Sequence, residues 1–419
     1  MENNKTPSIR FKGFTDPWEQ RKFGDGMDLL TGYPFESEKF SDNGINLIRG
    51  MNVKRGYLDL SNSLCMKWKS SEGLEKYLLE NEDILIQMDG ALIGKSYAKI
   101  KETQLPALLV QRVTRARAIP EKSNSDFMYQ TIQRDFLKYI ILNKTDSAIP
   151  HLSLNDIREF PIRVPNLEEQ KKIGEYFSNL DNLITLHQRK YNKLLNVKKS
   201  MLEKMFPKNG SNIPEIRFKG FTDPWEQRKF GDLADYKKGP FGSAITKDTF
   251  VPKSEESIKV YEQQNAINKD WELERYFLPK EYALTKLKSF EVHGGDIIVS
   301  CAGTIGKIYE IPKNADTGVI NQALMRVRVD EDCVDKRMFK IAFSTMIDDF
   351  TRAHSNGSAI KNIPPFSDLK PMGVLLPSLQ EQEKISSYFE NLDNLITLHQ
   401  RELDKLKNIK KSMLEKMFL

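Results

Sequence analysis

The sequence has few cysteines and no long apolar run, and both absences exclude classes of protein. Three cysteines, Cys65, Cys301 and Cys333, lie far apart with no CxxC pair or Cys/His cluster. Neither a disulfide framework nor a zinc site is therefore expected, and the cofactor and metal prediction is none. No stretch of about 18 apolar residues occurs, and the polar N-terminus lacks a signal-peptide core. We expect a cytoplasmic protein without membrane contact.

A strong excess of one charge is also lacking. The 64 basic and 58 acidic residues leave a net charge of +6, which permits a DNA partner without requiring one. At 419 residues, with 39% hydrophobic residues, the chain is long enough for two domains of roughly 150 residues each.

The chain contains an internal repeat of about 200 residues. Ile9–Asp25 returns identically at Ile216–Asp232, Asn179–Arg189 at Asn391–Arg401, and Lys198–Phe206 at Lys410–Phe418. The segments between these blocks differ, and the second is longer, because the offset grows from 207 to 212. Identical blocks indicate that both copies contact the same kind of partner surface, whereas divergent segments indicate contacts with two different surfaces. Recent duplication alone would not leave the segments between the identical blocks so different in sequence.

The identical blocks include two predicted long helices. From Leu167 to Phe206 there is no proline, and apolar residues recur with heptad spacing, with Tyr176, Leu183 and Val197 at the d positions. Each helix of about 39 residues would span roughly 58 Å, and its apolar stripe predicts a coiled coil with the other copy. The predicted a-position seam is Ile173, Leu180, His187, Leu194 and Met201, repeated as Ile385, Leu392, His399, Leu406 and Met413.

Periodicity does not decide between a parallel and an antiparallel pair. His187 and His399 each lie near the midpoint of their helix, so in an antiparallel pair they would meet and fix the register. We expect them to be packing residues rather than ligands, since two histidines are too few for a closed zinc site. Such a pair would hold two unlike domains apart, which suits a split DNA target, because a groove returns after about 34 Å.

In this arrangement the sequence resembles the specificity subunits of Type I restriction-modification systems. The resemblance rests on PNLEEQKKI (165–173) and PSLQEQEKI (377–385), on the FTDPWEQRKFGD blocks, and on GDIIVSCAGTIGK (295–307), weakly echoed by EDILIQMDGALIGK (82–95). It implies a mixed α/β fold with two target-recognition domains joined by two long helices in an antiparallel coiled coil with a pseudo-two-fold repeat.

The domain boundaries follow from the repeat and the resemblance. We expect an entry segment at 1–17, a first recognition domain at 18–164, a helix at 165–206 and a linker at 207–215. The second recognition domain with its entry segment would occupy 216–376, and the second helix 377–419.

The resemblance also implies a non-catalytic subunit and its partners. These are double-stranded DNA, two modification subunits that carry S-adenosylmethionine and methylate adenine, and restriction subunits that complete an ATP-dependent nuclease. S-adenosylmethionine, ATP and Mg²⁺ would then belong to the partner subunits.

Candidate DNA-reading residues are the side chains that match base edges or phosphates. Arginine and lysine suit guanine, and asparagine and glutamine suit adenine, while residues that recur in both copies suit phosphate. The candidates are Arg49, Asn52, Lys54, Arg55, Lys95, Gln111 and Arg112 in the first copy, and Gln263, Gln264, Asn265, Lys269, Lys307, Asn321 and Gln322 in the second.

Two motifs keep alternative functions open. Asp89–Ser96 approaches a P-loop but has aspartate at the first glycine position, and Asn362–Phe366 approaches a methyltransferase (N/D)PP(Y/F) loop but has isoleucine before the prolines. We expect a tight turn and a domain-closing segment there. The alternatives are a catalytic methyltransferase or NTPase, and a coiled-coil scaffold without DNA readout.

Overall fold

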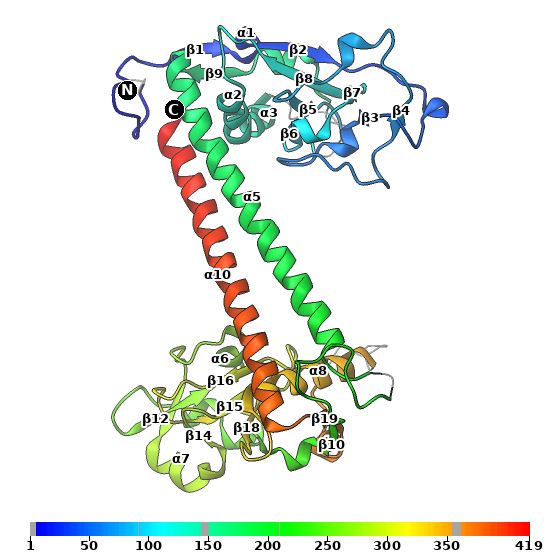
Figure 1. Cartoon of the computed structure of the whole chain (residues 1–419). Helices are drawn as coiled ribbons and strands as arrows, with labels where there is room; N and C mark the ends of the chain where they lie inside the picture. The colour runs from blue at the N-terminus through cyan, green and yellow to red at the C-terminus, as the bar shows by residue number, and fades with distance from the viewer. Residues whose placement is uncertain (1–5, 91, 144–150, 209, 354–361) are drawn as a thin grey trace. The chain divides into compact units, whose positions relative to one another are not determined.

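A computed structural model describes residues 6–90, 92–143, 151–208, 210–353 and 362–419 (Figure 1). The chain divides into two compact units. Unit 1 consists of Met1–Tyr191 with Leu398–Leu419, and unit 2 is Asn192–Thr397. The units therefore do not follow chain order, because each contains the end of the other copy's long helix.

Unit 1 is built on an antiparallel sheet of order β2-β8-β5-β6, beside a second sheet of order β4-β3-β7 in which β3 and β7 are parallel. The pair β1-β9 closes the domain, with Glu19 opposite Val164. The bounds are β1 Glu19–Lys22, α1 Phe23–Gly26, β2 Met27–Thr31, β3 Ile45–Ile48, β4 Lys67–Trp68, β5 Ile84–Gln87, β6 Tyr97–Lys99, β7 Ala107–Leu109, β8 Val113–Ala118, α2 Ser125–Thr131, α3 Leu137–Asn143, α4 Leu154–Arg158 and β9 Pro161–Val164.

Unit 2 repeats this topology with sheets β11-β18-β15-β16 and β13-β12-β17-β14 and the closing pair β10-β19. The parallel pair is now β12 and β17. The bounds are β10 Glu226–Lys229, β11 Ala234–Lys238, β12 Ser257–Tyr261, α6 Gln263–Asn268, β13 Phe277–Pro279, α7 Lys280–Lys286, β14 Glu291–Val292, β15 Ile297–Ser300, β16 Ile308–Glu310, β17 Gly318–Ile320, β18 Leu324–Val329, α8 Lys336–Ala353, α9 Phe366–Leu369 and β19 Gly373–Leu376.

The central strands are short apolar runs, as expected of strands buried on both faces. Ile84, Leu85 and Ile86 of β5 and Ile297, Ile298 and Val299 of β15 are all buried. Neighbouring arginines bind carboxylates at corresponding places: Arg117 Nε lies 2.7 Å from Asp83, and Arg328 Nε lies 2.8 Å from Asp296. The divergent segments therefore fold alike.

Two long helices pass from one unit to the other along the chain: α5 (Leu167–Lys204, 38 residues) and α10 (Leu379–Met417, 39 residues). In unit 1, His187 meets His399 and Asp181 pairs with Lys410, so residues later in α5 contact residues earlier in α10. In unit 2, Lys198 pairs with Asp393, which is the same ion pair with the two copies exchanged. The helices are antiparallel within each unit, and the predicted fold class is confirmed.

The predicted seam residues face inward at different depths. Ile173, Leu180, Ile385 and Leu392 are buried, and Leu194, Met201, Leu406 and Met413 pack half-buried against the cores. The His187 and His399 Nδ1 atoms lie 3.3 Å apart, close enough for one imidazole to donate to the other. One assignment is wrong: Leu183, expected at a d position, is 45% exposed. The contact instead uses the a residues and the residues four positions after them, such as the buried Phe177.

The helix ends complete the domain cores. Phe418 is 4% exposed and stacks on Phe127 of α2 at 5.1 Å, with Trp18 at 5.8 Å. In unit 2, Phe206 takes the same place against Trp225 at 5.6 Å. In the described part of the chain, no helix has both the length and the apolar content of a membrane span.

Candidate nucleic-acid interface

The polar residues of unit 2 meet where β11, β12, β15 and β17 end. The Gln263 side chain, after β12, donates to the carbonyl of Ala302, after β15, at 2.6 Å. The amide N–H of Asn321, after β17, donates to the carbonyl of Tyr261, the last residue of β12. Four loops therefore form one edge of the domain, and loops on a rigid sheet are common binding sites.

Unit 1 builds the same edge from the loops after β2, β3, β5 and β7. The Arg112 carbonyl, after β7, accepts from the Met88 N–H, after β5, and Gly56, after β3, donates to the Tyr97 carbonyl. The Gln111 N–H donates to Tyr33, just after β2. Each copy thus presents an equivalent edge of loops on the same strand framework, and the side chains on the two edges differ.

Burial separates the fourteen candidates into three groups. Eight are exposed: Arg55, Lys95, Gln111, Arg112, Gln264, Lys269, Lys307 and Gln322. Four are partly buried: Arg49, Lys54, Gln263 and Asn321. Asn52 and Asn265 are fully buried.

Asn52 and Asn265 hold equivalent loops. Asn52 Oδ1 accepts from the Arg49 N–H, and its Nδ2 donates to the carbonyls of Asp59 and Leu64. Asn265 accepts from the Glu262 N–H and donates to two downstream carbonyls in the same way. Both ends of each amide are used by the backbone, so we assign both residues a structural role instead of the expected readout.

Three partly buried candidates are also engaged within the domain. Arg49 Nη2 donates to the Leu64 carbonyl at 2.6 Å, and its guanidinium lies over the Phe40 ring. Asn321 Oδ1 accepts from the Ala323 N–H and shapes its turn. Gln263 is bound as described above. Lys269 is exposed but caps the far end of α6, about 9 Å along the helix from Gln263.

The exposed arginines of unit 1 have weaker ties. Arg112 Nε lies 3.7 Å from Asp89 and its Nη1 lies 3.5 Å from His151 Nδ1. The Arg112 side chain is 58% exposed, so these long contacts are worth little in water. The Arg55 guanidinium lies near the Tyr97 hydroxyl. Burial raises the pKa of Tyr97, and the nearby Arg55 charge partly offsets this rise. Arg112 is therefore an exposed arginine held only by weak internal contacts at this edge.

Two aromatic residues at the same edge were missed from sequence. Phe241, after β11, is 89% exposed, and Tyr33, after β2, is 38% exposed. The available signal was a glycine at the end of the matching strand in both copies, Gly32 and Gly239, with an aromatic residue one or two positions later.

Neither near-miss motif has the structure its catalytic counterpart needs. The described residues of Asp89–Ser96 lie between the antiparallel strands β5 and β6, with Gly90 and Gly94 at positive φ. Strand β6 follows them, where a P-loop needs the N-terminus of a helix to bind phosphate. Asn362 bridges to Ala302, and Phe366 packs on Tyr236 at 6.2 Å. Ala148–Leu152, the first-copy counterpart, lies partly outside the described residues.

Metal ligands do not gather at the edge. Among the described residues, no group of three His, Cys, Asp or Glu side chains could hold an ion. Cys301, directly after β15, is buried, and this burial raises the pKa of its thiol to about 12, so it stays protonated and is a poor nucleophile.

The paired loop edges agree with a family match. A model described as "Type I restriction modification DNA specificity domain" matches residues 15–196 and 222–408, once in each copy. The chain belongs to this family. The prediction of a DNA-specificity subunit that is not itself an enzyme is confirmed at the level of the family.

Individual members of the family support this assignment. The Type I restriction enzyme EcoAI specificity subunit of Escherichia coli is 30% identical over 183 residues, which cover 42% of this chain and 30% of that subunit. The MjaVIII specificity subunit of Methanocaldococcus jannaschii is 25% identical, covering 81% of this chain and 79% of its own. A Type I restriction-modification S subunit from M. genitalium shares the fold, with a TM-score of 0.64 at 14% identity and 99% coverage of both chains.

Proposed function

We propose that each unit reads one half of a split DNA sequence through its loop edge. One observation carries this proposal: the same framework presents Gln111 and Arg112 in unit 1 but Gln322 and Ala323 at the corresponding positions in unit 2. Arginine suits guanine and glutamine suits adenine. Two different readers on one framework suit an asymmetric target.

We also propose that the repeated helix surfaces bind two copies of one modification subunit. Leu183 and Leu186 of α5 are 45% and 46% exposed, and their identical counterparts Leu395 and Leu398 of α10 are 44% and 52% exposed. Neighbouring apolar residues on one helix face suit another helix. Methylation of adenine, with S-adenosylmethionine, and cleavage, with ATP and Mg²⁺ on restriction subunits, would belong to these partners.

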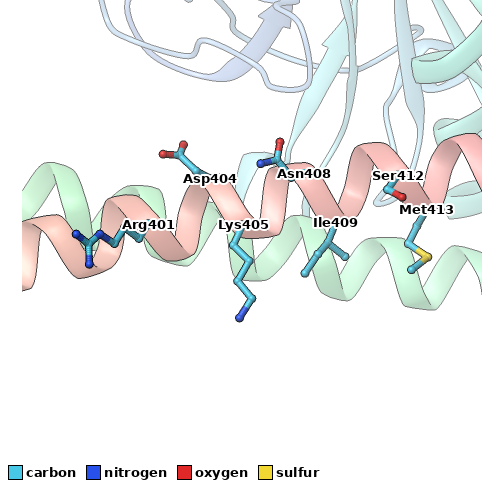
Figure 2. Close-up of a pocket in the computed structure, with 7 residues that line it drawn as sticks. All are labelled: Arg401, Asp404, Lys405, Asn408, Ile409, Ser412 and Met413. Atoms are coloured by element: carbon cyan, nitrogen blue, oxygen red, sulfur yellow. The ribbon is translucent and has the colours of Figure 1, made fainter. Parts of the chain in front are cut away.

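A shallow groove of about 620 Å³ along α10 in unit 1 supports repeated docking. Figure 2 shows Asp404 and Asn408 on one side of the helix and Lys405, Ile409 and Met413 on the other. Five of its seven lining residues recur in α5 as Arg189, Lys193, Asn196, Ser200 and Met201.

A single substitution tests the reading role. Replacing Arg112 with alanine, the residue at the corresponding position of the second copy (Ala323), should change the bases preferred in one half of the methylated sequence only. The assay is methylation of a randomised DNA library by the chain with its modification subunit. An unchanged preference would remove Arg112 from the readers, and wild-type methylation without any preference would favour the scaffold alternative.

A further inference from the structure

Phe241 is an exposed aromatic ring at the DNA-reading edge of unit 2. Its side chain is 89% exposed at the tip of the turn after β11, between the buried Pro240 and the exposed Gly242. Single exposed apolar residues are common, so exposure alone carries no inference. The inference rests instead on the residues that lie beside the ring.

The turn that carries Phe241 lies directly against the loop after β17. A Cβ atom on Gly239 would lie 1.8 Å from the Asn321 carbonyl oxygen, and one on Gly242 would lie 2.4 Å from Gln322 Oε1. Two glycines thus let the backbone approach this loop, and the Gln322 side chain lies beside the turn. An exposed ring and an exposed amide are therefore neighbours.

We propose that Phe241 and Gln322 together read one A·T base pair in the major groove, with the Phe241 ring against the thymine 5-methyl group. The amide of Gln322 has the donor and acceptor that match adenine N7 and N6–H, and phenylalanine is a known partner of the thymine methyl. Cytosine has no such methyl group. This inference rests on the proposed reading role of unit 2.

Unit 1 lacks this combination. The position that corresponds to Phe241 is Pro34, whereas Gln322 has a counterpart in Gln111. Tyr33 packs on Phe35 and Tyr77 with ring centroids 5.0 and 5.3 Å away. Without an exposed ring at position 34, unit 1 has an amide at this place but no partner for the thymine methyl group. The A·T reader is therefore specific to the half-site of unit 2.

Removal of single methyl groups from the DNA tests the contact. The full chain, in complex with its modification subunit, is bound to its methylation target, in which each thymine of the half-site read by unit 2 is replaced in turn by deoxyuridine. One replacement should weaken wild-type binding about fourfold, the factor expected for one buried methyl-sized group. Phe241→Ala should weaken binding to the thymine duplex roughly tenfold or more and remove the difference between thymine and uracil.

Two further variants complete the design. Gln322→Ala should relax the preference for adenine opposite the same thymine. Leu284→Ala, which removes an exposed apolar side chain of α7, should behave as wild type on both duplexes. Thermal unfolding should be the same for Phe241→Ala and wild type, since the ring is exposed.

Two results would overturn the inference alone. One is wild-type affinity of Phe241→Ala for the thymine duplex. The other is a Phe241→Ala variant that binds the thymine duplex more weakly while no uracil replacement weakens binding of the wild-type complex. The ring would then contact another part of the DNA. A wild-type complex without any sequence preference would overturn both this inference and the proposed function.

Discussion

At the residue scale, the repeat preserves one buried ion pair in each unit. Arg10 of the first entry block binds Glu169 of α5 through two bonds of 2.7 Å, and Glu169 is fully buried. Arg217 binds Glu381 in the same way, and the Glu381 side chain is 1% exposed. Bidentate pairs fix direction as well as distance, so each pair locks an entry block onto the start of its helix.

Neutralising the carboxylate should loosen the entry block. Glu169→Gln leaves the Arg10 charge, only 12% exposed, without its counter-charge. Removal of one partner of a buried pair costs about 3–5 kcal/mol, and we expect the lower end because Gln keeps one acceptor. Hydrogen–deuterium exchange of peptides around Arg10 should become faster.

The neighbouring Glu168 provides a matched control. It pairs with Lys171 on the surface, so Glu168→Gln should change exchange little, consistent with about 1 kcal/mol or less for exposed pairs. Equal exchange in the two variants would show that the buried pair does not hold the block.

Residue types could be predicted at the candidate site, but their exposure could not. Asn52 and Asn265 were chosen because amides suit adenine, yet their amides hold loops whose shape depends on carbonyls up to twelve residues away. Phe241 was missed because a phenylalanine is normally expected in a core. Only the folded structure shows that the Phe241 side chain is exposed.

At the element scale, the long helices could be predicted almost to their ends, because heptad spacing is local. The first helix, expected within 165–206, runs from Leu167 to Lys204 as α5. The sheets could not be predicted, because their pairings join distant segments: β1 pairs with β9, more than 130 residues later. The repeat did predict that both copies would share one topology.

The end of α10 should stabilise the core of unit 1 and not that of unit 2. Phe418 is buried among Trp18, Phe127 and Phe177. Phe418→Ala should cost about 3–5 kcal/mol, as is usual for a buried phenylalanine. Hydrogen exchange should become faster in α2 while α8 is unchanged.

The mirror variant gives the control. Phe206→Ala should speed exchange around Trp225 in unit 2, with a smaller effect, because Phe206 is only half-buried. Faster exchange in both units from either single variant would contradict the exchange of helix ends between the copies.

At the scale of the whole molecule, repeated surfaces imply repeated partners. Leu183→Glu with Leu186→Glu should remove one of two bound modification subunits, because it places charge on one of the two identical exposed pairs. Native mass spectrometry would measure the stoichiometry. Leu142→Glu, at a 79% exposed position of α3, is the control and should retain both subunits. Two bound subunits in the paired variant would exclude this face as the docking site.

The central claim is that this chain selects a split DNA sequence through two different readers. Methylation mapping of genomic DNA, in cells that express the chain with its modification subunit, tests it most directly. The account predicts a two-part, asymmetric motif with methyl-adenine in both halves, absent without the chain. A confirmed complex whose methylation follows no motif, or the same motif without this chain, would contradict it.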